Sequence, residues 1–236
     1  MPEIQKMNKD KLVSGVVALV GAGVVAGLYW FNYGAHSYAY SYNQYLVGNI
    51  MGLLWIPMLS VFSMGESPEK FGFAAGWSKR TGVVLAVLFA VLAILMLGAA
   101  RMHSFQSYYP IFRRYPEFVG VFGQYPKANP FVGAPLLMLY AEASYGMYLF
   151  CWEFFFRGYL LFGLARSIGW WAIIVQALAF GFLHWGKPPV ELIGSFGAGV
   201  ILGIIALRAK SFVPCFAIHW AVSVTFDLMI VAARLH

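Results

Sequence analysis

The chain has 236 residues, of which 61% are hydrophobic and only 11% are charged, and its formal net charge is +7. Soluble domains carry about a quarter of charged residues, so this composition excludes an ordinary soluble enzyme. The basic residues are scattered rather than gathered in one stripe, so nucleic acid is not expected as a partner. We expect an integral membrane protein whose first partner is membrane lipid.

Apolar runs of about 20 residues, the length that spans a bilayer, follow one another along the chain. Their order predicts spans near residues 12–31, 45–64, 81–100, 132–165, 168–184, 189–207 and 212–233. The run at 132–165 is either one long tilted helix or a short helix that leads into a span. The predicted fold class is therefore all-α, a polytopic transmembrane helical bundle of about seven spans, with six to eight as the range.

The loop at 101–129 is rich in Tyr, Phe, Arg and Pro. Such a segment is expected to lie along the membrane interface rather than to cross the bilayer. We predict a single membrane domain with two parts. Residues 1–131 hold the N-terminal helices and this aromatic loop, and residues 132–236 hold the helical core.

Basic residues in short loops favour the cytoplasmic side of a membrane. Counting spans places one set of them on the same side: Lys6, Lys9, Lys11, Lys70, Lys79, Arg80, Arg166, Arg208 and Lys210. The exceptions lie in the loop at 101–129. We expect a multi-pass protein of the bacterial plasma membrane with a cytoplasmic N-terminus.

Ionisable residues inside the last four predicted spans indicate a candidate site, because an ionised group at the bilayer centre costs roughly 2.5–3.5 kcal/mol. Glu153 and Arg157 are four residues apart and share a helix face, so they can neutralise each other. Such a pair can also be purely structural. His184 and His219 would each be read alone as satisfied core histidines, but on neighbouring spans beside a buried glutamate they favour a site.

These residues resemble, in order and spacing, the CAAX protease and bacteriocin-processing (CPBP/ABI) family of intramembrane proteases, which includes the Ras-converting CAAX endopeptidases. The family motif Glu-Glu-x-x-x-Arg is matched in part by Glu153 and Arg157, and Phe-x-x-x-His is matched by Phe180 and His184. A glycine-rich span and a proline then precede His219. The resemblance covers about residues 145–227.

Two positions depart from the family pattern. Trp152 stands where the first glutamate, usually assigned to water activation, is normally found, and Ser223 stands where the family has Asn or Asp. Either change is compatible with a variant active site or with a protein that has lost the activity.

The resemblance implies an intramembrane endopeptidase acting on membrane-associated or lipid-anchored peptide or protein substrates. We expect Glu153 and His184 to hold a water molecule and remove its proton, with Arg157 positioning Glu153. His219 and Ser223 would donate hydrogen bonds to the oxyanion. No cofactor is expected, and zinc is the less favoured option although two histidines and a carboxylate are its usual ligands.

Other interpretations stay open. The main alternative is a catalytically inactive protein of the same fold that acts in binding or bacteriocin immunity. A transporter would require an internal repeat, which the two halves do not show, and a rhomboid-like dyad with Ser195 lacks the Gly-x-Ser-Gly arrangement. Asp227 could orient His219 or approach the interface, and Glu142 could replace the missing glutamate only if the helix bends back.

Overall fold

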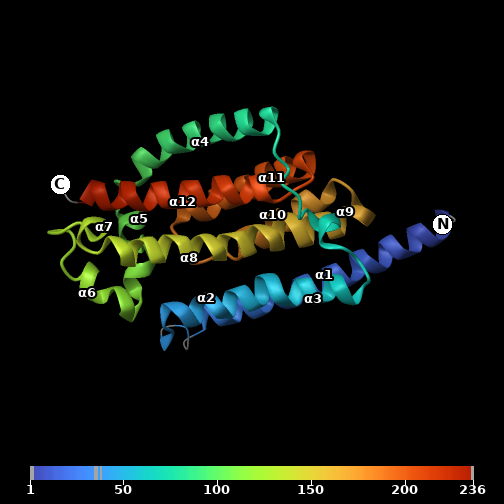
Figure 1. Ribbon diagram of the computed structural model, residues 1–236, viewed down its shortest axis with the longest axis horizontal. Helices are drawn as coiled ribbons and strands as arrows, with labels where there is room; N and C mark the ends of the chain where they lie inside the picture. Colours follow the sequence, from blue (N-terminus) through green and yellow to red (C-terminus); the bar gives the residue numbers. More distant parts are fainter. Residues whose placement is uncertain (1–2, 35–36, 38, 235–236) are drawn as a thin grey trace.

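The computed structural model describes residues 3–34, 37 and 39–234, and within these ranges the chain is a bundle of helices without strands (Figure 1). The predicted all-α polytopic fold class is confirmed. The long helices are α1 (Glu3–Tyr33), α2 (Tyr42–Ile50) with η2 (Met51–Trp55) and α3 (Ile56–Ser63), α4 (Lys79–Ala99), α8 (Pro135–Glu153) with η6 (Phe154–Leu160) and α9 (Leu161–Ile168), α10 (Trp171–Phe182), α11 (Pro189–Ala209) and α12 (Val213–Arg234).

In the part of the chain that the structure describes, five helices are long and apolar enough to cross a membrane. They are Ile4–Tyr33, Tyr42–Ser63, Lys79–Ala99, Pro189–Ala209 and Val213–Arg234. The apolar helix α10 is shorter. The chain is therefore an integral membrane protein, as the composition predicts.

From Pro135 on, the segment predicted at 132–165 forms one continuous helical path in the middle of the bundle, between α12 on one side and α1 to α3 on the other (Figure 1). Its central part, η6, is a π-helix in which every residue is buried. π-Helical turns inside α-helices are frequent at functional sites. Gly158 is needed here, because a Cβ atom at this position would lie 2.8 Å from the Phe71 carbonyl oxygen.

Helices α10 and α11 pack in close contact because α11 presents glycines to α10. A Cβ at Gly199 would lie 2.8 Å from the Cβ of Ala177, and the side-chain amide of Gln176 donates to the Gly199 carbonyl at 2.7 Å. The small residues spaced four apart in α11 thus let two membrane helices approach closely, as the sequence predicts.

The aromatic loop forms short helices at one end of the bundle: α5 (His103–Tyr108), η4 (Ile111–Arg114), η5 (Pro116–Phe118), α6 (Val119–Phe122) and α7 (Pro130–Gly133). The Tyr42 ring, from the start of α2, contacts the rings of Phe112 and Phe118. The Tyr42 backbone N–H donates to the Glu117 carboxylate at 3.0 Å. These contacts hold the loop against the helix ends.

Glu66, in the loop between α3 and η3 (Pro68–Phe71), binds three cations at the opposite end of the bundle. Its carboxylate lies 2.7 Å from Lys9 Nζ, 3.0 Å from Lys70 Nζ and 3.1 Å from Arg166 Nη1. Although burial opposes ionisation, these cations lower the pKa of Glu66 from its ordinary value of 4.5 to about 2. Three basic residues that the sequence places on one side of the membrane therefore meet at one acid.

Replacing Glu66 by Gln is expected to lower the free energy of unfolding by about 1–3 kcal/mol at neutral pH, because the three cations depress the folded-state pKa of Glu66 but solvent screens the exposed lysines among them. The contribution of a carboxylate with a depressed pKa is present above the unfolded value and is lost as pH falls from 4.5 toward 2. Thermal unfolding in detergent at pH 7, 4 and 3 measures it. The exposed neighbour Glu69, changed to Gln, is the matched control. An equal loss in both variants would contradict this role of Glu66.

Candidate active site

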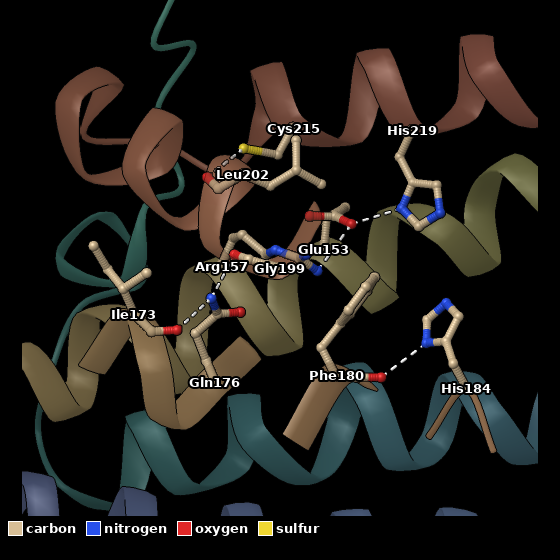
Figure 2. Close-up of polar contacts among 10 residues, drawn as sticks. All are labelled: Glu153, Arg157, Ile173, Gln176, Phe180, His184, Gly199, Leu202, Cys215 and His219. Atoms are coloured by element: carbon tan, nitrogen blue, oxygen red, sulfur yellow. Dashed lines mark hydrogen bonds and ion pairs between the residues drawn. The ribbon is translucent and has the colours of Figure 1, made fainter. Parts of the chain in front are cut away.

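Glu153, Arg157 and His219 form one hydrogen-bonded cluster (Figure 2). Arg157 Nη1 donates to Glu153 Oε1 at 3.2 Å, and His219 Nδ1 lies 2.6 Å from the same oxygen. The side chains of Glu153 and Arg157 are 0% exposed, whereas that of His219 is 24% exposed. Of the three, His219 is therefore the group that another molecule can reach.

The contact with Glu153 fixes how the His219 ring is used. A carboxylate oxygen only accepts hydrogen bonds, so Nδ1 of His219 carries a proton and donates it to Glu153. In the neutral ring this leaves a lone pair on Nε2. A carboxylate behind an imidazole orients the ring and stabilises the imidazolium that forms when Nε2 takes a proton.

His184 lies two residues after the end of α10 and is held by the backbone of that helix. Its Nδ1 lies 2.8 Å from the Phe180 carbonyl oxygen, which again leaves Nε2 without a proton when the ring is neutral. The Phe180 ring lies 4.5 Å from the His184 ring centre, and the Arg157 guanidinium carbon stands 3.9 Å over the same phenylalanine ring. Phe180 thus links the Glu153 cluster to His184 (Figure 2), which gives the spacing Phe-x-x-x-His a structural reason.

Two cavities meet at the two histidines. The first, here called the polar cavity, has a volume of about 60 Å³. It is lined by Asn32, Tyr33, Tyr45, Tyr108, Ile111, Arg114, Tyr145, Tyr148, Leu149, Trp152, Leu183, His184, Lys187 and His219. A buried site needs roughly 10–15 Å³ per water, so this cavity has room for a few water molecules beside His184 and His219.

The second cavity, here called the apolar groove, has a volume of about 420 Å³ and lies between α4, α11 and α12. It is lined by Leu88, Leu92, Phe180, His184, Glu191, Gly194, Ser195, Gly197, Ala198, Ile201, Leu202, Ile218, His219 and Val222. His184 and His219 belong to both linings. The histidines therefore face polar surroundings on one side and apolar surroundings on the other.

The structure does not bring all the predicted site residues into direct contact. Glu153 binds His219, whereas the sequence predicts that it shares a water with His184. Ser223 is absent from the described residues that line the two cavities. Asp227 is buried two turns beyond His219, and both carboxylate oxygens of the buried Glu142 lack a partner within the described residues.

Trp152 occupies the place of the family's first glutamate. Its ring lies 5.8 Å from the ring of His184, in an edge-on arrangement, and lines the polar cavity. Its indole Nε1 is buried without a hydrogen-bond partner among the described residues. An apolar ring thus borders the water-sized space where the family has a carboxylate.

Sequence reasoning missed most of the polar cavity wall. Tyr33, Tyr45, Tyr108 and Arg114 come from outside the motif region, and no spacing rule joins them to it. A second polar cavity of about 300 Å³ shares these four residues and extends toward the aromatic loop. The tyrosine hydroxyl groups beside apolar helices are the signal that could have identified these residues as the lining of a water-filled cavity.

The wall that separates the cavities also contains an ion pair. Lys187 Nζ lies 2.8 Å from Glu191 Oε1, and the Tyr109 hydroxyl donates to the same carboxylate at 2.7 Å.

Among the residues described, no group of three or more His, Cys, Asp or Glu side chains is placed to hold a metal ion.

The fold and the site define a polytopic helical membrane protein with a buried Glu–Arg pair and two histidines at a shared cavity. Residues 134–225 match the family described as type II CAAX prenyl endopeptidase Rce1-like. This range contains the predicted site residues Glu153, Arg157, His184, His219 and Ser223. The resemblance inferred from the motifs is confirmed by this match, which covers residues 134–225. No curated protein and no solved structure matches the chain.

Proposed function

We propose that this protein is an intramembrane endopeptidase that hydrolyses peptide bonds of membrane-anchored substrates with a water activated by His219 and His184. The observation that supports it most is the 2.6 Å contact between His219 Nδ1 and the buried Glu153 carboxylate. This contact leaves the second ring nitrogen of an accessible histidine as a base, at a cavity of water-molecule size.

The contacts favour a different division of roles from the one inferred from the motifs. Glu153 is fully buried, and its Oε1 already accepts hydrogen bonds from Arg157 and His219. We therefore assign Glu153 to orienting His219 and stabilising its charged form, and Arg157 to holding the Glu153 carboxylate in position. His219 becomes the general base. Ser223 as a second oxyanion donor remains a proposal with no contact to support it.

In the reaction, Nε2 of His219 takes a proton from water while His184 Nε2 accepts a hydrogen bond from the same molecule. The water oxygen forms a bond to the peptide carbonyl carbon, which gives a tetrahedral intermediate. The protonated His219 then returns its proton to the peptide nitrogen, and the carbon–nitrogen bond breaks. General acid–base transfer of this kind contributes roughly 10²–10⁴-fold to a rate. No cofactor is required for these steps.

The substrate class follows from the surroundings of the histidines. The candidate base lies within a membrane-spanning bundle, so a peptide must be anchored in or near the bilayer to reach it. We propose membrane-associated or lipid-anchored peptides and proteins as substrates, and a cytoplasmic N-terminus in a bacterial plasma membrane. The alternative function, binding or bacteriocin immunity without catalysis, is favoured by one observation, the indole of Trp152 in the place of a glutamate.

Cleavage of a panel of membrane-anchored reporter peptides by the purified protein tests the proposal. In water enriched in ¹⁸O, the new carboxyl group of the N-terminal fragment is expected to carry one ¹⁸O atom, measured by mass spectrometry, and the C-terminal fragment none. His184→Ala removes the second acceptor for the water and is expected to lower kcat by roughly 100-fold. The control is His103→Ala, which removes an imidazole from the exposed surface.

Two results would contradict the proposal. Absence of cleavage by the wild type across prenylated, acylated and transmembrane reporters would support the binding function. Cleavage that is equal in wild type and His184→Ala at the same folded yield would place the chemistry elsewhere.

A further inference from the structure

The outer wall of the apolar groove is the least buried of the five candidate spans. Only 11% of the apolar window of α4 is buried, against 28–33% in the other four candidate spans. Figure 1 shows α4 on the outside of the molecule, next to α12. Leu88 and Leu92 are half-buried at the groove, whereas Val87 and Val91 are exposed. The groove is therefore separated from the surrounding lipid by a single helix with few buried side chains.

The inner wall leaves the backbone of α11 open. A Cβ atom built at Gly194 or at Gly197 meets no atom within 4 Å. These glycines do not serve helix packing, in contrast to Gly199, where the Cβ would lie 2.8 Å from Ala177. Helix surfaces that lack side chains let a second backbone approach closely. This favours a peptide over a lipid chain as the occupant, because a lipid chain needs no approach to a backbone.

The groove ends at the histidines on the side opposite the polar cavity. His184 and His219 line both spaces, so an occupant of the groove and water from the polar cavity meet at the same two rings. The groove is apolar along α4, α11 and α12, with Glu191, already paired with Lys187, as its charged residue. It therefore suits an uncharged segment.

We propose that the apolar groove between α4, α11 and α12 binds the apolar peptide segment next to the scissile bond, and that this segment enters from the bilayer past α4. Gly194 and Gly197 set the size of the side chains that the groove accepts. The inference rests on the proposed function, because a scissile bond exists only if the protein cleaves peptides. Occupancy of the groove by an apolar peptide can nevertheless be measured without cleavage.

The test uses an apolar 20-residue transmembrane peptide that carries one benzophenone side chain, with the full-length protein in phosphatidylcholine nanodiscs. Irradiation and mass spectrometry of the digest locate the cross-links. We expect cross-links to α4 and α11 around Leu88 and Ile201. Gly194→Leu and Gly197→Leu, whose added Cβ atoms would meet no atom within 4 Å, fill part of the groove and are expected to reduce them at least 5-fold. Gly23→Leu on α1 is the matched control, because its Cβ also meets no atom within 4 Å and it lines neither cavity.

The outcomes separate this inference from the proposed function. Cross-links in the groove with no cleavage of any reporter would leave the groove assignment standing and remove the protease. Cross-links elsewhere, or cross-links equal in Gly194→Leu and Gly23→Leu, would overturn the assignment. A photoreactive phospholipid that labels the groove and is not displaced by the peptide would identify lipid as the occupant and would also overturn it. If reporters are cut, both groove variants should raise KM more for leucine-flanked than for alanine-flanked bonds.

Discussion

His219→Ala is expected to lower the rate of reporter cleavage by roughly 10²–10⁴-fold while leaving the fold intact. The side chain is 24% exposed, and its only hydrogen bond recorded among the described residues goes to Glu153. Its removal therefore opens little of the buried core but deletes the base. Single-turnover kinetics in detergent, at matched thermal stability, measure the chemical step.

Glu153→Gln is the companion variant, because it keeps the shape of the side chain and removes its charge. We expect a loss of kcat with little change in KM, since Glu153 is fully buried and touches His219 rather than a substrate. A Glu153→Gln enzyme with wild-type kcat would show that the carboxylate does not support His219. His103→Ala, on the exposed surface, controls for the loss of an imidazole.

Arg157→Met is expected to destabilise the protein by about 3–5 kcal/mol, the usual cost of leaving a buried charge without its partner. The guanidinium is fully buried, pairs with Glu153 at 3.2 Å and stacks on Phe180. Methionine keeps part of the volume but leaves the Glu153 carboxylate with the hydrogen bond from His219 alone. Thermal unfolding in detergent should show a clear drop in the midpoint.

The double variant Glu153→Gln/Arg157→Met decides whether charge or packing causes that drop. Removing both charges of a buried pair is often neutral, so we expect the double variant to regain most of the lost stability while remaining inactive. If it is no more stable than Arg157→Met, the loss comes from the missing contact with Phe180. The Glu153–Arg157 pair would then stabilise the protein mainly through the packing of Arg157 on Phe180.

The long helices and their order could be predicted from hydropathy alone, because a span of about 20 apolar residues is set by the thickness of the bilayer, whereas the short helices of the loop at 101–129 could not. The motif spacings also singled out Glu153, Arg157, His184 and His219, and the Glu153–Arg157 pairing follows from helix geometry. Which histidine meets Glu153 could not be predicted. That choice depends on how α8 and α12 pack against each other, and an interhelical distance leaves no periodic trace in the sequence.

The lining of the cavities was also out of reach of sequence reasoning. Arg114 lies in a loop that the sequence places at the interface, yet its side chain lines the polar cavity with His184. Likewise Gly194 and Gly199 belong to the same glycine-rich helix, but only the three-dimensional packing shows that one faces open space and the other Ala177. The sequence shows which residue types are present, but only the packing shows which of them line a cavity and which form helix contacts.

Tyr33, at the end of α1, donates its hydroxyl to the Leu183 carbonyl at 2.9 Å, next to His184. This tyrosine lies before residue 134, where the match to the family begins, and so do Tyr45, Tyr108 and Arg114 of the same polar cavity wall. The motif residues and this part of the polar cavity wall therefore lie in different parts of the sequence. Changes in the first 130 residues can retune how water and peptides arrive at the histidines without altering a single motif residue, so proteins with the same motifs need not share a substrate.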